Sequence, residues 1–529
     1  MLFCGLFFFV GLAVFWLFGN FGWFSSSLVL GYSCLDLPFL FMVDDISIVC
    51  CYMLGCCGVI ALFYCYHYFS SDPSGFILFL LMFVFILVMF VLMLSFSLVS
   101  LLVFWEYLGL VSFFLILFYS NSVSLRAAII TLFASRFGDV SLFILIFWLA
   151  SLWDLSSCFS LVLLFFIILT KSAGYPFVSW LIEAMRAPTP VSSLVHSSTL
   201  VAAGVWFLLR FDWFFTPGFL SFLLLLCLVT VFVSGFCAAT FVDLKKIVAL
   251  STCNNVSWCI VFFICGDVCL ALLQLLCHGV SKCYLFISVG DVMSASSGSQ
   301  ASKAVYLSRY GSSFGGLVQL VLVFSLCGLP FLGVFFGKHG LMPGLLYSCN
   351  SFLVCVLFLC FFLSYIYSFR FYLLLLGESV GLSVGFFSSF VLVFGLSLLS
   401  TFLNYGGSFL FLEYSCLGSL SSIMFLMIQV FGLFVGGILW YYCFQSRGAI
   451  WSSSLGGSDF LVLLVYSWFL QASSSFLLGF YRWEAYLLSF FRSAGLKSVL
   501  HMRDYRLFSI NFMLLGGAIL FGSYVVIFC

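Results

Sequence analysis

Residues 170–200 read TKSAGYPFVSWLIEAMRAPTPVSSLVHSSTL, and they decide what kind of protein this chain is. The stretch follows an apolar run over 161–169 and places Lys171 five residues before Pro176. A charge at the centre of a membrane helix costs roughly 2.5–3.5 kcal/mol on insertion scales. Lys171 is therefore a functional candidate, and the proline beside it predicts an interrupted helix.

The composition of the whole chain predicts an integral membrane protein. The 529 residues are 65% hydrophobic and only 7% charged, with a mean hydropathy of +1.31, whereas a soluble domain is about 25% charged. The net charge of +1 predicts no nucleic-acid partner. Abundant Phe, Leu, Val, Cys, Gly and Trp indicate a coding strand rich in T and G, which favours an organellar gene.

We expect an all-α, polytopic membrane protein of about 15 transmembrane helices, because a span needs about 20 apolar residues. Residues 459–500 are different, since the apolar part at 459–470 is too short to span. We expect a helix there that lies along the membrane surface or along neighbouring helices. The expected spans are 2–24, 44–67, 76–97, 99–119, 125–150, 157–185, 190–211, 217–240, 244–265, 268–291, 312–338, 345–373, 381–403, 418–444 and 507–528.

Two of the expected spans are irregular. The span 157–185 contains Lys171 and its proline, and the span 312–338 contains Pro330 and Lys338. Broken helices in corresponding positions of two halves indicate inverted repeats with an ion site near the midplane. We therefore expect two inverted halves, each with a broken helix.

Three charged residues precede Lys171 inside apolar spans. Glu106 has no charged neighbour in sequence, so it is either neutral and hydrogen-bonded or paired with a cation of another helix. Arg136 and Asp139 are three residues apart and share a helix face. They are either a self-neutralising pair at a packing point or part of a proton relay.

Lys171 has no charged residue three or four positions away, so its partner must come from another helix. Burial disfavours a charged lysine and a nearby carboxylate favours it. A lysine balanced between these two effects can bind and release a proton.

Further basic residues follow in later spans. His196, next to Ser197, Ser198 and Thr199, is either a satisfied core histidine or a relay in a hydrated site. His278 and Lys282 are four residues apart on one face, which favours a shared proton.

Two pairs of adjacent basic residues complete the set of candidates. Of Lys245 and Lys246, we expect one to be an interfacial anchor and Lys246 to face inward. Lys338 and His339 lie in the second broken span, where the alternative to a proton role is a lysine that extends to the membrane surface.

These buried ionisable groups, one or two per helix, suit a proton pathway with coupled sites. A substrate transporter would need a larger polar cavity. The chain has no phosphate-binding glycine loop, CxxC cluster or haem motif, so we expect no cofactor and no metal site. We interpret the 23 cysteines as packing residues.

Seven segments resemble the antiporter-like subunits of NADH:ubiquinone oxidoreductase, the respiratory complex I, and they lie in that family's order. A basic Lys338 in the second broken helix resembles the chain 5 branch, because chain 4 usually has a glutamate there. The segments are SSDP (70–73), FWEYLGLVSFFLI (104–116), AAIITLFASRFGD (127–139), KSAGYPFVSWLIEAMRAPTPVSSLVHSSTLVAAG (171–204), DLKKIVALST (243–252), HGVSKCYLF (278–286) and GLPFLGVFFGKH (328–339).

The resemblance implies a proton-translocating subunit that couples electron transfer from NADH to ubiquinone to proton pumping. It implies that other subunits bind FMN, the iron–sulfur clusters and ubiquinone. The implied partners are the other membrane-arm subunits, especially chain 4, accessory subunits and lipids such as cardiolipin. The implied location is the mitochondrial inner membrane.

The resemblance also implies roles for single residues. Glu106 and Lys171 would be the coupled pair of the first half-channel, Lys282 the central connector and Lys338 the terminal lysine of the second. The implied relay residues are Arg136, Asp139, His196, Lys246, His278 and His339.

The implied organisation has five parts. They are N-terminal transmembrane helices (1–75), a proton-translocating core of two inverted half-channels (76–380), C-terminal transmembrane helices (381–458), a lateral amphipathic helix (459–506) and a final anchor (507–529).

The chain departs from the family pattern at five positions around the candidate residues. The changes leave the lysines in place but affect the side routes by which protons would leave. These departures leave open a complex I scaffold that has lost pumping. A subunit of a multisubunit cation/proton antiporter, which shares this core, is the other alternative. The departures are Gly174, Val178, Arg186, Gln274 and His339.

Overall fold

The structure is a computed structural model, and within the residues that it describes ten helices are long and apolar enough to cross a membrane. The fold is an all-α, polytopic membrane protein, as expected from the composition. The described residues are 28–34, 37–70, 72–150, 158–266, 268–296, 298, 300, 302, 313–329, 333–348, 350–376, 419–443, 455 and 458–500.

The helices begin and end close to the expected spans, because apolar runs set their length and prolines and polar turns end them. The expected spans 2–24, 381–403 and 507–528 lie outside the described residues. The long helices are α2 (Asp45–Tyr68), α3 (Gly75–Leu94), α4 (Leu98–Leu117), α5 (Ser122–Ala150), α10 (Pro217–Ala238), α11 (Leu244–Cys265), α12 (Val268–Ala295), α15 (Ser351–Leu376) and α17 (Ser419–Cys443).

The described part also contains one β-hairpin, which the sequence analysis did not predict. Strands β1 (Leu28–Cys34) and β2 (Leu37–Val43) are antiparallel, with Leu28 opposite Val43. The buried Arg210 fixes the end of β2 to the helices: it pairs with Asp44 and donates a hydrogen bond to the Met42 carbonyl at 3.3 Å.

The first broken helix is confirmed. Helix α6 (Cys158–Ser172) ends one residue after Lys171, and the chain resumes as the short α7 (Ser179–Ala184). Ala173 has a φ of 55°, so the backbone leaves the helical path immediately after α6. The segment continues through the cis Tyr175–Pro176 bond.

The second broken helix is also confirmed. Helix α13 (Ser313–Cys327) ends at Gly328, whose φ of 78° favours glycine, and α14 (Phe335–Ser348) begins seven residues later. A Cβ atom at Gly328 would lie 3.3 Å from the Lys338 side chain. The break thus leaves helix-end carbonyls beside a lysine.

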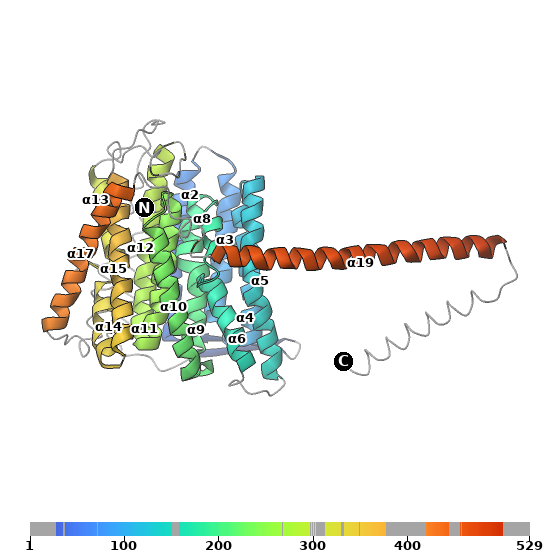
Figure 1. Cartoon of the computed structure of the whole chain (residues 1–529), viewed down its shortest axis with the longest axis horizontal. Coiled ribbons are helices and arrows are strands. Elements are labelled where there is room, and N and C mark those ends of the chain that lie inside the picture. Colours follow the sequence, from blue (N-terminus) through green and yellow to red (C-terminus); the bar gives the residue numbers. More distant parts are fainter. Residues whose placement is uncertain are drawn as a thin grey trace. The chain divides into compact units, whose positions relative to one another are not determined.

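Helices α8 (Thr189–Leu194), η1 (Val195–Thr199) and α9 (Leu200–Arg210) together form one membrane-length segment. Figure 1 shows helices α2 to α17 running roughly parallel to one another. Consecutive helices α2 to α6 pack side by side, as do α10, α11 and α12, and α15 packs against both α13 and α17.

The chain divides into two compact units, residues 1–459 and 460–529. Within the second unit, α19 (Ser458–Leu500) continues as one helix of 43 residues in all. At 1.5 Å per residue it is about 65 Å long. The prediction that residues 459–500 are helical is confirmed.

Candidate functional site

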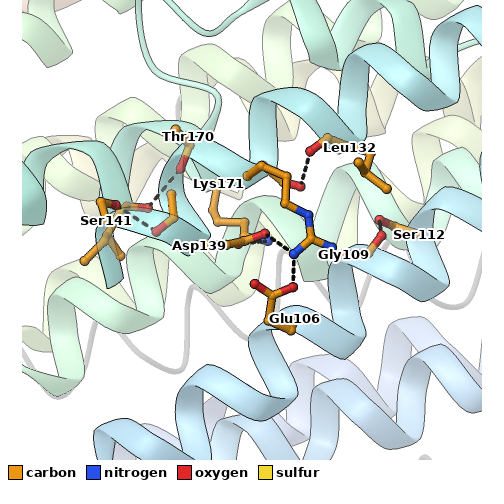
Figure 2. Close-up of polar contacts among 12 residues, drawn as sticks. Glu106, Gly109, Ser112, Leu132, Asp139, Ser141, Thr170 and Lys171 are labelled. Carbon is orange, nitrogen blue, oxygen red and sulfur yellow. Dashed lines mark hydrogen bonds and ion pairs between the residues drawn. The ribbon is translucent and has the colours of Figure 1, made fainter. Parts of the chain in front are cut away.

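Four charged side chains from three neighbouring helices form a series of ion pairs, which we call the charge chain. Arg136 of α5 pairs with Glu106 of α4, and its guanidinium lies 3.6 Å from Asp139. Asp139 lies 3.4 Å from the Nζ atom of Lys171 at the end of α6 (Figure 2). The four charges alternate in sign and sum to zero when all are ionised.

The two ends of the charge chain differ in burial. The side chains of Asp139 and Lys171 are each 1% exposed, whereas those of Glu106 and Arg136 are 38% and 39% exposed. The Lys171 ammonium also lies 5.1 Å from the centre of the Trp105 ring. Because a buried ion needs a partner, Asp139 and Trp105 are the groups that make a charged Lys171 tolerable.

Close packing of α5 against α6 places Asp139 at Lys171. A Cβ atom at Gly138 would collide with the Thr170 side chain, so a glycine is required for this approach. Thr170 itself donates a hydrogen bond of 2.7 Å to the Phe166 carbonyl within α6.

The structure resolves three of the alternatives for these residues. Lys171 does take its partner from another helix, and Glu106 is paired with a cation of a neighbouring helix. Arg136 and Asp139 do not neutralise only each other. In the described part of the chain, Glu106 and Lys171 form no direct ion pair, because Arg136 and Asp139 lie between them.

His196 lies in η1, a π-helical turn of the kind that often occurs at functional sites. It is fully buried, and its ring nitrogens have no hydrogen-bond partner among the described residues. The neighbouring hydroxyls donate to backbone instead: Thr199 and Ser198 donate to the Leu194 carbonyl at 2.8 and 3.3 Å. The relay role of His196 stays a prediction.

The prediction that Lys246 faces inward is wrong. Lys246 pairs with Asp243 at 2.8 Å, and both side chains are about one third exposed. Lys245 is the buried member, 5% exposed, and its Nζ atom donates to the Ala187 carbonyl at 3.1 Å. Neighbouring positions on a helix point in directions about 100° apart, so only one of the two lysines can face the core.

Helix α12 carries Gln274, His278 and Lys282 at intervals of four, all buried. Lys282 donates hydrogen bonds to the Ser251 hydroxyl and, at 3.4 Å, to the Val248 carbonyl, both on α11. The side-chain nitrogens of His278 and both polar atoms of Gln274 have no hydrogen-bond partner in the described residues. Lys282 is thus oriented toward α11.

A cavity of about 20 Å³ adjoins Lys282 on the side of the second break. Its polar wall includes Asn255 and Ser368, and its far wall includes Cys327, the last residue of α13. Both polar atoms of the buried Asn255 side chain lack a partner within the described residues. A cavity needs about 10–15 Å³ to hold a water molecule, so this one has room for one.

Lys338 is fully buried at the start of α14, which excludes the alternative of a lysine that extends to the membrane surface. Its Nζ atom donates to the Cys327 carbonyl at 2.7 Å and to the Ser364 hydroxyl at 3.2 Å. It lies 5.1 Å from the centre of the Tyr365 ring and 5.3 Å from that of Phe361. No carboxylate pairs with Lys338 among the described residues.

The structure describes no contact between the lysines and four of the residues that depart from the family pattern, namely Gly174, Val178, Arg186 and His339. His339 is half-buried, and its ring is tilted by 39° against that of Phe335, with the ring centres 5.4 Å apart. Arg186 pairs with Glu183 at 2.9 Å. The relay role of His339 stays a prediction.

Several polar residues around the lysines were not among the residues expected from the sequence. Asn255 and Gln429 had a usable signal, because each is an amide in an otherwise apolar span. Ser251, Ser364 and Tyr365 had none, since serines and tyrosines are common throughout this chain. The described residues contain no group of three or more His, Cys, Asp or Glu side chains that could hold a metal ion.

Comparison with known proteins places these features in one family. Residues 95–364 match the model of the transmembrane region of the NADH:quinone oxidoreductase/Mrp antiporter family. The chain is 33% identical to NADH-ubiquinone oxidoreductase chain 5 of Locusta migratoria, covering 70% of this chain and 68% of the relative. It is also 33% identical to the Caenorhabditis elegans chain 5, with 68% and 70% covered.

A solved structure gives a fold match. The chain is similar to a chain of the Mrp complex from Dietzia sp., with a TM-score of 0.70 and 21% identity. The match covers 89% of this chain and 56% of the Mrp chain.

Proposed function

Because this chain belongs to the NADH:quinone oxidoreductase/Mrp antiporter transmembrane family, we propose that it is a proton-translocating subunit of the respiratory NADH:ubiquinone oxidoreductase. One observation carries the proposal. Lys171, Lys282 and Lys338 lie on three different helices inside the bundle, and each is at most 1% exposed. Three buried lysines in a membrane protein are costly to maintain, and such residues mark ion or proton pathways.

The charge chain provides the first half of the route. Asp139 lies between Arg136 and Lys171, so it can stabilise either cation. When Lys171 releases its proton, Asp139 still has the Arg136 guanidinium 3.6 Å away, so its carboxylate is not left without a cation nearby. Lys171 can therefore change its charge without unfolding the site.

Lys282 connects the two halves. Its ammonium is held by Ser251, and the adjoining cavity extends to Cys327, whose carbonyl accepts a hydrogen bond from Lys338. A single water held by Asn255 in this cavity would bridge Lys282 toward the second break. Protons move along such hydrogen-bonded groups when neighbouring sites titrate together.

The exposed end of the charge chain supports an assembly with other subunits. Glu106 and Arg136 lie near the middle of α4 and α5, yet more than a third of each side chain is exposed. In contact with lipid, the exposed parts of this ion pair would have no polar groups to replace their hydration. We therefore propose that a neighbouring membrane subunit of the chain 4 type covers the pair. FMN, iron–sulfur clusters and ubiquinone would be bound by other subunits of the complex.

The location follows from the same reasoning. We propose the mitochondrial inner membrane, with an organellar gene.

Helix α19 is about 65 Å long, twice the roughly 30 Å thickness of a bilayer core. A helix of that length fits along a membrane better than across it.

A second candidate function is a subunit of a multisubunit cation/proton antiporter, which the similarity to the Mrp complex favours. Native-gel separation followed by mass spectrometry and an NADH-oxidation stain distinguishes the two. Flavin and iron–sulfur subunits that co-migrate with the chain support the first function. Only small hydrophobic partners would support the second.

The pumping role is tested by replacing the terminal lysine. We expect a Lys338→Met complex to assemble and to oxidise NADH while it translocates fewer protons per electron. The control is Arg126→Met, which removes an exposed cation at the start of α5. A Lys338→Met complex with the proton yield of the control would refute a proton role for Lys338.

A further inference from the structure

Helix α17 packs unusually closely against α15. A Cβ atom at Gly432 would lie 2.8 Å from Tyr365 Cβ, and one at Gly436 would lie 2.7 Å from the Ile366 carbonyl oxygen. Two glycines four residues apart let membrane helices approach each other at backbone distance. The pair therefore fixes the side of α17 that faces α15.

Gln429 lies on the same face of α17, one turn before Gly432. It is 2% exposed, and its Nε2 atom lies 3.1 Å from the Tyr365 hydroxyl and 3.4 Å from the Gly328 carbonyl oxygen. The Tyr365 hydroxyl in turn donates to the Gly328 carbonyl at 3.3 Å. An amide, a phenol and a carbonyl released by the helix break thus form a closed set of three hydrogen bonds.

The tyrosine in this set is also a direct neighbour of the terminal lysine. The Tyr365 and Phe361 rings are 5.1 and 5.3 Å from Lys338 Nζ. The ring centre of Phe425, one turn before Gln429, lies 5.9 Å from that of Phe361 and 6.5 Å from that of Tyr365. Helix α17 therefore supports both aromatic groups that face the Lys338 charge.

A desolvated ammonium is attracted to the face of an aromatic ring, and the strength of this attraction depends on ring position. Lys338 has no carboxylate partner in the described residues, so ring position contributes more here than at Lys171. Gln429 and Tyr365 lie outside residues 95–364, the part that matches the family model. The hydrogen bonds between Gln429, Tyr365 and Gly328 therefore bring α17, which lies after residues 95–364, into contact with the second break.

We propose that Gln429 is a positioning residue for proton transfer at Lys338. It fixes the Tyr365 hydroxyl on the Gly328 carbonyl and so holds the Tyr365 ring over the lysine. Loss of the amide lets the ring rotate away and makes the protonated lysine harder to form. The inference rests on the proposed pumping function, and it adds a role for a helix beyond the matched region.

The test compares proton translocation per electron, and its rate, in intact complexes reconstituted in vesicles. Gln429→Leu keeps the side-chain volume and removes both hydrogen bonds. We expect it to lower the rate of proton translocation about fivefold, which corresponds to the loss of a typical hydrogen bond. Tyr365→Phe keeps the ring and should lower the rate by a similar factor. The double variant should be no slower than the slower single variant, because both changes break the same hydrogen-bonded set.

The matched control is Gln319→Leu. Gln319 is a buried amide of α13 that donates to the Ser288 carbonyl at 3.3 Å and does not touch the rings over Lys338. Equal losses in Gln319→Leu and Gln429→Leu would overturn the proposal, as would multiplicative losses in the double variant. If Gln429→Leu does not assemble, Tyr365→Phe decides alone, and an unchanged rate overturns the proposal.

The outcome also separates this inference from the pumping function. A Lys338→Met complex with reduced proton yield, beside a Gln429→Leu complex with full yield, would refute only the positioning role. Full yield in both complexes would refute the pumping role of Lys338 as well.

Discussion

The two broken helices carry similar lysines in different electrostatic surroundings. At the first break, Lys171 is paired with Asp139 within a chain of four charges that sums to zero. At the second, Lys338 is surrounded by a carbonyl, a hydroxyl and two aromatic rings, without a carboxylate among the described residues. The first site stabilises a charged lysine with a carboxylate, whereas the second has only neutral groups with which to stabilise the charge of Lys338.

Under the proposed pumping function, this difference would give the two lysines different tasks. A lysine paired with a carboxylate, as Lys171 is, would store a proton and release it when the carboxylate pairs with another cation. An unneutralised lysine is a short-lived acceptor, because burial without a counter-ion disfavours its charge. Along a proton route from Lys171 to Lys338, the stabilisation of the charged lysine would therefore decrease.

The largest effect is expected when the first break is made to resemble the second. Asp139→Asn leaves the buried Lys171 without its carboxylate partner, and losing one partner of a buried pair costs about 3–5 kcal/mol. We expect a marked loss of assembled complex on native gels and a lower thermal unfolding temperature.

The control for this change is Asp243→Asn. The pair of Asp243 with Lys246 is about one third exposed, and such pairs contribute at most about 1 kcal/mol. If both variants assembled to the same extent, Asp139 would not be the group that stabilises Lys171.

A smaller effect is expected when one of the polar groups at the second break is removed. Ser364→Ala deletes one of the two hydrogen-bond acceptors of Lys338, which is worth about 1 kcal/mol. We expect normal assembly of the complex and a rate of proton translocation about fivefold lower than that of the unaltered complex.

Ser234→Ala is the matched control, because Ser234 is a buried helix serine that bonds only to the Val231 carbonyl in the described structure. Equal rates in the two variants would mean that the Ser364 hydroxyl does not stabilise the protonated lysine. The contrast between the two breaks would then depend on the rings and the Cys327 carbonyl alone.

The sequence predicted both breaks and the helical spans that fall within the described residues, because apolar length and proline are local signals. It also predicted that Lys171 needs a partner from another helix. It could not identify Asp139 as that partner, since the residues are 32 positions apart and only the packing of α5 on α6 brings them together. The charge chain is thus a tertiary feature built from residues that were each recognised separately.

Three other features could not be derived from local sequence. Lys245 and Lys246 are adjacent on a helix with apolar residues on all sides, so no pattern indicates which one faces inward. Strands β1 and β2 come from apolar sequence, and apolar character alone does not indicate that the two segments pair as strands. Gln429 contacts Tyr365 only because two glycines of α17 allow a close approach to α15.

The central claim is that Lys282 joins the two breaks into one proton route, and the proton-to-electron ratio of a Lys282→Met complex tests it most directly. Met retains the length and apolar part of the side chain but cannot bind a proton, so assembly and NADH oxidation should continue. We expect a ratio below that of the unaltered complex. An unchanged ratio would contradict the role of Lys282 as the connector of the two breaks.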